Sequence, residues 1–425
     1  MKLLLRLLLP VLCLCVLQLH AQDMPRVRQT IDTLTSPYFH GRGYIFDGDA
    51  KAANYIHDRY KAAGLKPISD TYFQEFSMPV NRVTQTPELA VNGHKLIPGT
   101  DFVANAQTAA GKGKATIVYL DTLVFTNDAA AQQFFSQSFR KKTLVYPQHY
   151  RKQVWELPEA YLQKVLEAKL HIILQPKALM TTVAARPATV PIVEVKKDVW
   201  PATAQKVKYK LVSEFTPAHK TQNVIAFIPG TAQPDSFIVF SAHYDHLGGQ
   251  GKDVYFPGAN DNASGTTMLL ELAAHYSKPQ NQPKYSMAFM AFAAEEAGLL
   301  GSVYYTDHPL FPLQNIRFLV NLDLLGTGDE GIMVVNGSIH PKEFSLLQTI
   351  NSQENYLPQV KMRGRAANSD HYPFSERGVP AFFFYTLGGT AAYHNTQDHS
   401  RQLPLTKFKE VFRLITDFAK ALQPR

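Results

Sequence analysis

The chain has 425 residues, which is long for one domain and sufficient for two. Hydrophobic residues make up 45% and charged residues 18%, a balance that indicates a globular protein with a sizeable core. The formal net charge is +8, but no Lys/Arg block concentrates it. The basic excess therefore indicates a solvated surface and argues against a nucleic-acid-binding protein.

The first 21 residues have the features of a secretory signal peptide. Lys2 and Arg6 precede an apolar run from Leu7 to Leu17, and Ala21 supplies a small residue at the predicted cut. Cleavage would lower the net charge from +8 to +6 and would remove both cysteines. We therefore expect export to the periplasm or beyond, no disulfides and no membrane span in the mature chain. An uncleaved anchor is the alternative.

The chain between this segment and residue 221 contains two kinds of pattern. Asp49–Ala63 is predicted to be a helix that stops at Gly64, and a strand-like piece follows at Thr71–Phe76. From about Glu88 the chain has short alternating strands and polar turns, and it gathers no His, Asp and Glu at ligand spacing. This middle third is predicted to be an inserted β-rich module that carries no chemistry of its own.

From Gln222 onward, apolar strands alternate with helices. This rhythm predicts an α/β fold with a mixed, mostly parallel sheet that is covered by helices on both faces. Phe408–Leu422 is predicted to close the chain as an amphipathic helix. The predicted strands are Val224–Phe227, Phe237–Phe240, Met287–Ala293, Ile316–Asp323, Ile332–Val335 and Ala381–Tyr385, and the predicted helices between them are Ser264–Tyr276 and Ser302–Thr306.

Acidic residues and histidines recur where these strands end. His243 and Asp245 follow one strand, Glu295 and Glu296 follow another, and Asp261 begins a helix. Ligands in open α/β sheets bind beyond the carboxyl ends of the strands, so we expect these side chains to meet. Two further members of the set lie elsewhere in the chain: Asp323 ends a strand, and His394 follows the aromatic strand Ala381–Tyr385.

Two histidines and three carboxylates suffice for two Zn²⁺ ions, with two ligands for each ion and one carboxylate shared between them. The adjacent glutamates would then supply one ligand and one general base, because neighbouring side chains diverge. Asp245 would orient His243 without binding metal.

The motifs HYD, NDNASG, AAEEAGLLGS, NLD and YH, in this order, resemble those of the co-catalytic zinc aminopeptidase family, which includes aminopeptidase Y and secreted bacterial leucyl aminopeptidases. The resemblance covers the N-terminal helix and everything from about Gln222. It implies a zinc exopeptidase fold, two zinc ions per chain and peptide N-termini as substrates. It also implies the following roles: His243 and Asp323 bind one zinc, Glu296 and His394 bind the other, Asp261 bridges them, Glu295 is the base, and the Tyr393 hydroxyl stabilises the oxyanion.

The resemblance, together with the signal-peptide pattern, suggests a division of the chain. Residues 1–21 would be the signal peptide, 22–87 the first part of the peptidase domain, 88–215 a protease-associated-like insertion, and 216–425 the zinc-binding catalytic domain. The bridging motif often begins with two acids, whereas this chain has Asn260 before Asp261. We expect metal binding to survive this change.

Several nearby residues have simpler interpretations. Ser264 is interpreted as a helix N-cap because no nucleophile elbow surrounds it. His246 and His399 are interpreted as spare histidines because the ligand positions are already filled. For Asp370 and His371, pocket lining and loop packing are equally good interpretations.

Three alternative functions stay open. A glutaminyl cyclase shares the expected fold but uses one zinc, although such enzymes usually lack the NASG continuation present here. A carboxypeptidase of the same superfamily is the second alternative, and a receptor-like ectodomain without catalysis is the third. The sequence determines neither the preferred substrate side chain nor the oligomeric state.

Overall fold

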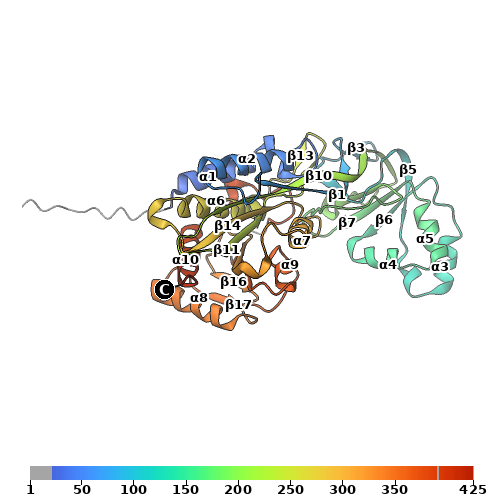
Figure 1. Ribbon diagram of the computed structural model, residues 1–425. Helices are drawn as coiled ribbons and strands as arrows, with labels where there is room; N and C mark the ends of the chain where they lie inside the picture. Colours follow the sequence, from blue (N-terminus) through green and yellow to red (C-terminus); the bar gives the residue numbers. More distant parts are fainter. Residues whose placement is uncertain (1–21, 390–391, 425) are drawn as a thin grey trace, which may run out of the picture.

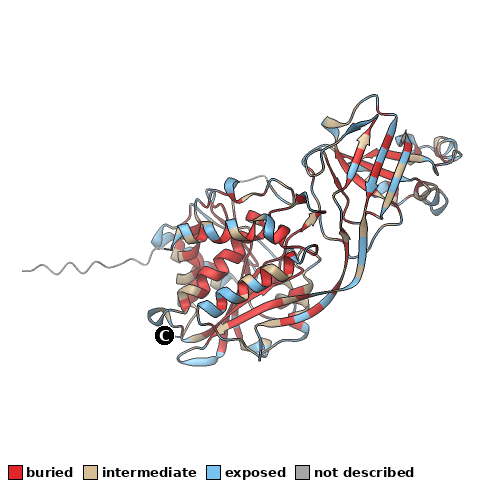
Figure 2. Cartoon of the chain, turned by 90° about the horizontal axis from the view of Figure 1, so that it is seen from above, coloured by how far each residue is buried: buried red, intermediate tan, exposed pale blue. Residues whose placement is uncertain are grey.

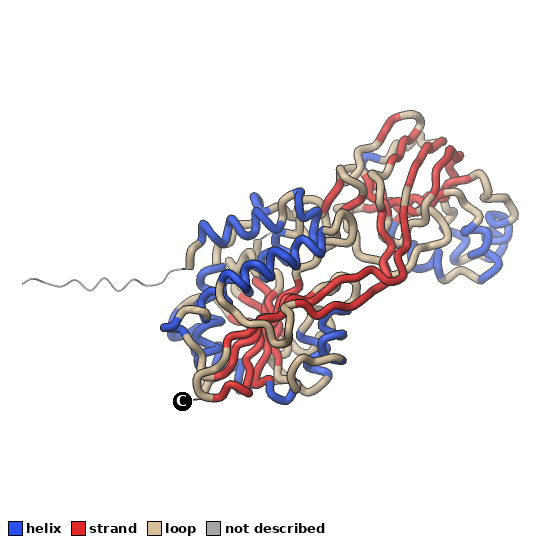
Figure 3. Tube along the Cα trace, turned by 45° about the horizontal axis from the view of Figure 1, so that its top comes forward, coloured by secondary structure: helices blue, strands red, loops and turns tan. Residues whose placement is uncertain are grey.

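The computed structural model describes residues 22–389 and 392–424, so the predicted signal peptide lies outside the described part. Two lobes make up the molecule (Figure 1), each built on an eight-stranded sheet. Two long strands, β1 (Phe73–Val83) and β10 (Ser213–Ile228), run between the lobes as an antiparallel ribbon (Figure 3). The chain thus leaves the first lobe on β1 and returns to it on β10.

The first sheet has the strand order β1-β10-β14-β11-β15-β18-β16-β17. Its four central strands are parallel to one another, whereas antiparallel pairs join β10 to β14 and β18 to β16. The strands not yet given are β11 (Gln233–His243), β14 (Tyr285–Phe292), β15 (Ile316–Leu322), β16 (Ile332–Val335), β17 (Val360–Met362) and β18 (Ala381–Thr386). The predicted mixed, mostly parallel sheet is confirmed.

Helices cover both faces of this sheet. The helices of the first lobe are α1 (Met24–Leu34), α2 (Gly48–Ala62), α6 (Gly265–Tyr276), α7 (Leu300–Asp307), α8 (Pro341–Glu354), α9 (His371–Glu376) and α10 (Phe408–Ala421). In β11, Ile238 and Phe240 pack in the core that includes α6 and α10, whereas Phe237 and Val239 pack in the core that includes α7 and α9. Burial on both faces explains why these strands are continuously apolar in the sequence, and Figure 2 shows the resulting buried interior.

Helix α10 illustrates how the sequence pattern becomes packing. Its buried residues recur at three- and four-residue spacing from Phe408 to Ala419, as predicted, while Leu422 lies just past its end and is half-buried. The prediction did not include α1 or α8. Both helices cover the same core, but their apolar residues are more widely interrupted by polar ones.

The second lobe is built from residues 88–211. Its sheet has the order β3-β2-β9-β5-β6-β7-β8-β4 and joins parallel and antiparallel pairs. The strands are β2 (Glu88–Val91), β3 (His94–Lys95), β4 (Phe102–Ala104), β5 (Gly111–Tyr119), β6 (Lys142–Pro147), β7 (Leu170–Gln175), β8 (Ile192–Lys196) and β9 (Lys206–Leu211). Three helices accompany it: α3 (Asp128–Phe135), α4 (Arg151–Trp155) and α5 (Glu159–Leu166).

None of the helices in residues 22–389 and 392–424 has the length and apolar character needed to cross a membrane.

Candidate metal centre

The acidic residues and histidines singled out in the sequence meet at one edge of the first sheet. His243 is the last residue of β11, and Asp323 directly follows β15. Glu295 and Glu296 come three and four residues after the end of β14. The parallel register sets the ends of β14, β11, β15 and β18 side by side, so these loops share one site.

Asp261 lies between the two predicted ligand pairs. Its Oδ1 is 3.4 Å from Nε2 of His243, and its Oδ2 is 3.1 Å from Nε2 of His394. His243 Nε2 is also 3.4 Å from Asp323 Oδ1, and His394 Nε2 is 3.2 Å from Glu296 Oε2. The two oxygens of one carboxylate thus face two different histidines.

The two 3.4 Å separations at His243 Nε2 are long for hydrogen bonds and suit a shared cation. Donor atoms about 2.0–2.2 Å from one tetrahedral Zn²⁺ lie about 3.3–3.6 Å from each other, and the spacing here is 3.1–3.4 Å. Asp323 Oδ1 and His246 Nε2 are buried with no hydrogen-bond partner in the described part of the chain. These two atoms are therefore available as ligands to a cation. The residues therefore fit a two-metal centre.

The ligand atoms gather into two groups in which all members lie within 4.8 Å of one another: His243, Glu295 and Asp323, and His246, Asp261 and Glu296. The second group contains His246, which was interpreted as a spare histidine. Two histidines contact the carboxylate of Glu296. His246 Nδ1 is 2.7 Å from Oε1, and His394 Nε2 is 3.2 Å from Oε2. His246 thus contacts the carboxylate on the side away from His394. His399 belongs to neither group among the described residues.

The adjacent glutamates have opposite pKa shifts. Burial raises the pKa of Glu295 well above its usual range, and the nearby carboxylate of Asp370 raises it further. Burial also raises the pKa of Glu296, but hydrogen bonds with His246 and His394 outweigh it and bring the value to about 2. Two neighbouring carboxylates whose pKa values differ in this way are typical of active sites. In such sites one carboxylate transfers protons and the other stays charged and stabilises positive charge.

Asp245 contacts more than His243. Its Oδ2 accepts a hydrogen bond of 2.9 Å from the Tyr44 hydroxyl, and its Oδ1 accepts one of 3.1 Å from the backbone N–H of Glu295. His243 Nδ1 is 3.2 Å from the backbone oxygen of Asp245 but 3.7 Å from its Oδ1. The carboxylate therefore positions the Glu295 backbone directly, and the imidazole is held mainly through the main chain.

Tyr393 lies at the mouth of the site. Its ring stacks on that of His394, with centroids 3.9 Å apart and planes at 14°, and its side chain is 44% exposed. Burial of part of the phenol, together with the charge of Asp261, raises its pKa above its usual range, so the hydroxyl stays protonated. A cavity of about 210 Å³ opens between this ring and His243, Asp261, Glu295 and Asp323.

Asp370 and His371 are buried and do not line this cavity, whereas the nearby Asn368 does. Asp370 Oδ1 instead accepts a hydrogen bond of 2.5 Å from the Ser302 hydroxyl. The packing interpretation of Asp370 and His371 therefore agrees with the structure, and the pocket-lining interpretation does not.

The turn that carries Asp261 is held by residues that the sequence analysis did not single out. Asp398 is buried and accepts hydrogen bonds from the backbone N–H groups of Asn260 and Asp261 at 3.0–3.1 Å. Gly258 has φ +61°, and a Cβ atom on it would lie 2.2 Å from the carbonyl oxygen of Asp261. Only glycine fits at that position.

Ser264 does not cap α6 with its side chain, so the N-cap interpretation is wrong in mechanism. It precedes α6, but its hydroxyl donates to the Asn260 carbonyl at 2.7 Å and accepts from the Leu325 N–H at 2.8 Å. Asn262 Oδ1 accepts from the Gly265 N–H instead. The reason is that Ser264 already has helical backbone angles, which turn its hydroxyl away from the free N–H groups of the first turn.

Arg42 is fully buried beneath the same turn. Its guanidinium donates to five backbone carbonyls, and the acceptors are Leu34, Tyr244, Pro257, Gly258 and Asp261, at 2.7–3.3 Å. Burial lowers its pKa to about 10, against the raising effect of the carboxylates of Asp261 and Asp398, so it is charged at neutral pH. Arg42 thus ties the N-terminal segment to the end of β11 and to the turn that carries Asp261.

Replacing Arg42 with Met should lower the free energy of unfolding by about 4 kcal/mol, because buried carbonyls would lose their donors. Chemical denaturation followed by fluorescence would measure this change. Arg59→Met, at an exposed position of α2, is the matched control and should change stability by less than about 0.5 kcal/mol. Equal effects of the two replacements would contradict the role given to Arg42.

The sheet, the covering helices and the cluster of histidines and carboxylates at the strand ends define the class of the protein, which has the zinc exopeptidase fold. Residues 223–419 match the model of Peptidase family M28. The match confirms, for this part of the chain, the resemblance proposed from the five motifs.

Curated relatives match about half of the chain. Aminopeptidase YwaD of Bacillus subtilis is 27% identical over 246 residues, which cover 53% of this chain and 50% of that protein. A probable leucine aminopeptidase of Arthroderma otae is 29% identical over 231 residues, which cover 52% and 61%. The chain therefore spans only about half to three fifths of the length of these relatives.

Solved structures match nearly the whole chain. BSAP, described as a zinc aminopeptidase from Bacillus subtilis, superposes with a TM-score of 0.71 at 21% identity and covers 93% of this chain and 94% of its own. A Peptidase M28 precursor from Shewanella amazonensis has a TM-score of 0.68 at 16% identity, with coverage of 94% and 95%. At such identities the likeness shows the fold, and it extends over both lobes.

Proposed function

We propose that the protein is an aminopeptidase that binds two zinc ions and removes N-terminal residues from peptides. The observation that carries this proposal is the position of Asp261, whose two oxygens face His243 and His394 in separate ligand pairs. The match of residues 223–419 to a peptidase family supports the hydrolytic chemistry.

In this proposal His243 and Asp323 would hold one ion, Glu296 and His394 would hold the other, and Asp261 would be shared between them. When bound, zinc ions polarise a scissile carbonyl and lower the pKa of a water molecule. His246 keeps Glu296 in place by contacting its Oε1 at 2.7 Å.

Glu295 acts as the general base. It lines the cavity beside His243 and Asp323, where a carboxylate can take a proton from the attacking water and give it to the leaving amine. The hydroxyl of Tyr393 donates a hydrogen bond to the oxyanion as charge develops on the carbonyl oxygen. The backbone N–H of Glu295 donates a hydrogen bond to Asp245. This contact fixes the main chain of the base and so keeps the base at a constant distance from the substrate.

A digest of a defined peptide panel, read by mass spectrometry with and without a zinc chelator, tests the proposal. Stepwise loss of N-terminal residues that stops when zinc is removed is the expected result. Loss of C-terminal residues would establish a carboxypeptidase instead. Conversion of N-terminal Gln to pyroglutamate, with one zinc per chain, would establish a glutaminyl cyclase. Absence of zinc and of any product would favour a non-catalytic ectodomain.

Ser369 offers a test of how the metal ligands are positioned. Its hydroxyl donates to Asp323 Oδ2 at 3.0 Å and accepts from the Asn321 amide at 2.8 Å, and all three side chains are buried. Ser369→Ala should weaken zinc binding about tenfold, because Asp323 would lose the partner that orients it. Competition with a fluorescent zinc chelator would measure the change. Ser345→Ala, at an exposed position of α8, should leave zinc affinity unaltered.

Export and domain identity complete the proposal. Residues 1–21 act as a signal peptide that directs the chain to the periplasm or the medium, and residues 88–215 form a protease-associated-like module. N-terminal sequencing of the exported protein should begin at Gln22. A retained N-terminus in the membrane fraction would indicate an anchor instead.

A further inference from the structure

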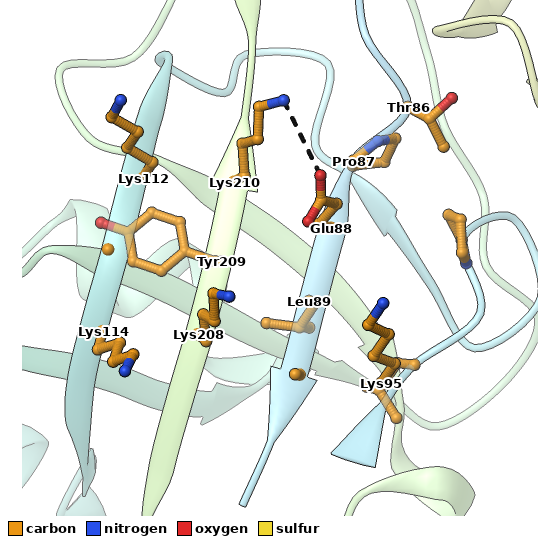
Figure 4. A pocket seen from close by; sticks show the side chains of 14 residues that line it. Thr86, Pro87, Glu88, Leu89, Lys95, Lys112, Lys114, Lys208, Tyr209 and Lys210 are labelled. Carbon is orange, nitrogen blue, oxygen red and sulfur yellow. Dashed lines mark ion pairs between the residues drawn. The ribbon is translucent and has the colours of Figure 1, made fainter. Parts of the chain in front are cut away.

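A second cavity lies in the other lobe, on the sheet of residues 88–211. It measures about 570 Å³ and is lined by β2, β5, β9 and the segment that contains β3 (Figure 4). Five exposed lysines line it: Lys95, Lys112, Lys114, Lys208 and Lys210. We call this feature the lysine groove.

Four of these lysines form two pairs in which one lysine stands directly opposite another on the neighbouring strand. Lys210 stands opposite Lys112, and Lys208 stands opposite Lys114, in the antiparallel pair of β5 and β9. Directly opposed side chains have Cβ atoms about 4.5–5.5 Å apart, so like charges in these positions repel and destabilise the sheet. An anion between the ammonium groups would relieve this repulsion.

The groove contains little negative charge of its own. Glu88 is the one carboxylate among its lining residues, and its Oε1 is 3.9 Å from Nζ of Lys210 (Figure 4). Both side chains of this pair are largely exposed, at 63% for Glu88 and 46% for Lys210, so the contact is weak. The other four lysines have no carboxylate partner among the lining residues, so the lining carries a net positive charge.

Apolar residues complete the lining, including Pro87, Leu89, Leu96 and Pro98. A ligand that fits must therefore combine negative charge with apolar surface. The positive charges are all lysines, whose flexible stems carry point charges, whereas arginine would be expected for bidentate binding of a phosphate group. Charge complementarity thus favours carboxylates that are spread along an amphipathic chain.

We propose that the lysine groove binds an extended acidic peptide segment in which carboxylate side chains alternate with apolar ones. Lysines two residues apart on β5 and β9 repeat at about 6.6–6.8 Å, which is also the repeat of side chains on one face of an extended peptide. β2 and β9 each have strand partners on both sides, so the segment lies across the face of the sheet and is held by side chains.

Fluorescence anisotropy with a short labelled peptide of alternating Glu and Leu tests this proposal. The peptide carries an acetylated N-terminus, so the proposed aminopeptidase activity cannot consume it and failure of that activity would leave the binding result intact. Saturable binding that weakens as ionic strength rises is expected. A matched peptide with Gln in place of Glu should not bind.

The variant K112Q/K208Q/K210Q should raise the Kd of the acidic peptide by at least about tenfold. The control variant K141Q/K197Q/K206Q removes the same charge from exposed lysines of the same lobe that do not line the groove, and it should change the Kd by less than about twofold. Thermal unfolding of all three proteins checks that they are equally folded. Equal loss of binding in both variants, or equal binding of the Gln peptide, would overturn the proposal. So would lysine-dependent binding of polygalacturonate or phosphatidylglycerol vesicles that is tighter than that of the peptide.

Discussion

Glu295→Gln is expected to lower kcat for aminoacyl-anilide hydrolysis by about a thousandfold while zinc content stays near two ions per chain. The amide of Gln has nearly the shape of the carboxylate but cannot take a proton from water, so the chemical step loses its general base. Steady-state kinetics and metal analysis on the same preparation would measure both quantities.

The metal count matters because Glu295 lies in the same group of ligand atoms as His243 and Asp323. Loss of one zinc along with activity would make Glu295 a ligand and not the base. Full activity with two zinc ions would reject the mechanism altogether. Glu354→Gln changes an exposed carboxylate at the end of α8 and is the matched control, for which kinetics and zinc content should both be unaltered.

Asp261→Ala should remove most of the bound zinc and reduce activity by more than about a thousandfold. Both ions would lose a ligand at once, since one carboxylate faces both ligand pairs. Metal analysis after gel filtration and turnover of an aminoacyl-anilide would report the two effects.

Thermal unfolding gives an independent measure of the same change. Zinc bound only by the folded state stabilises it, so a chelator should lower the Tm of the unaltered protein but hardly change that of Asp261→Ala. Asp235→Ala, at an exposed position near the start of β11, should behave like the unaltered protein in both assays. Retention of both zinc ions by Asp261→Ala would exclude the bridging role.

Much of the first lobe was predictable because its strands are buried on two faces. Burial on both sides requires continuously apolar runs, such as Phe237–Phe240, and the polar residues that follow each run then mark the ends of the strands. The positions of His243, Asp261, Glu296, Asp323 and His394 follow from that rule together with the order of the motifs. Helices α1 and α8 were missed because each buries only a few apolar side chains: Val27, Ile31 and Leu34 in α1, and Phe344 and Leu347 in α8.

The residues that hold the site in place were not predictable in the same way. Arg42 binds backbone carbonyls only, and a sequence does not show which carbonyls a turn will leave without donors. Asp398 accepts hydrogen bonds from backbone N–H groups 137 and 138 residues away in the sequence. Nothing in the residues next to Asp398 in the sequence distinguishes it from a solvated acid. His246 looked superfluous by count, but the fold puts it against Glu296.

The fold class, the order of the chemical groups and the likeness to a zinc peptidase family could all be inferred from the amino-acid sequence, because each of these depends on local pattern and spacing. Three features required the folded structure: which oxygen of Asp261 faces which histidine, the contact of Asp245 with the Glu295 main chain, and the opposed lysines on β5 and β9. These features depend on strand register and on the meeting of distant loops. Contacts of that kind are set by packing across the whole molecule, which no single stretch of sequence encodes.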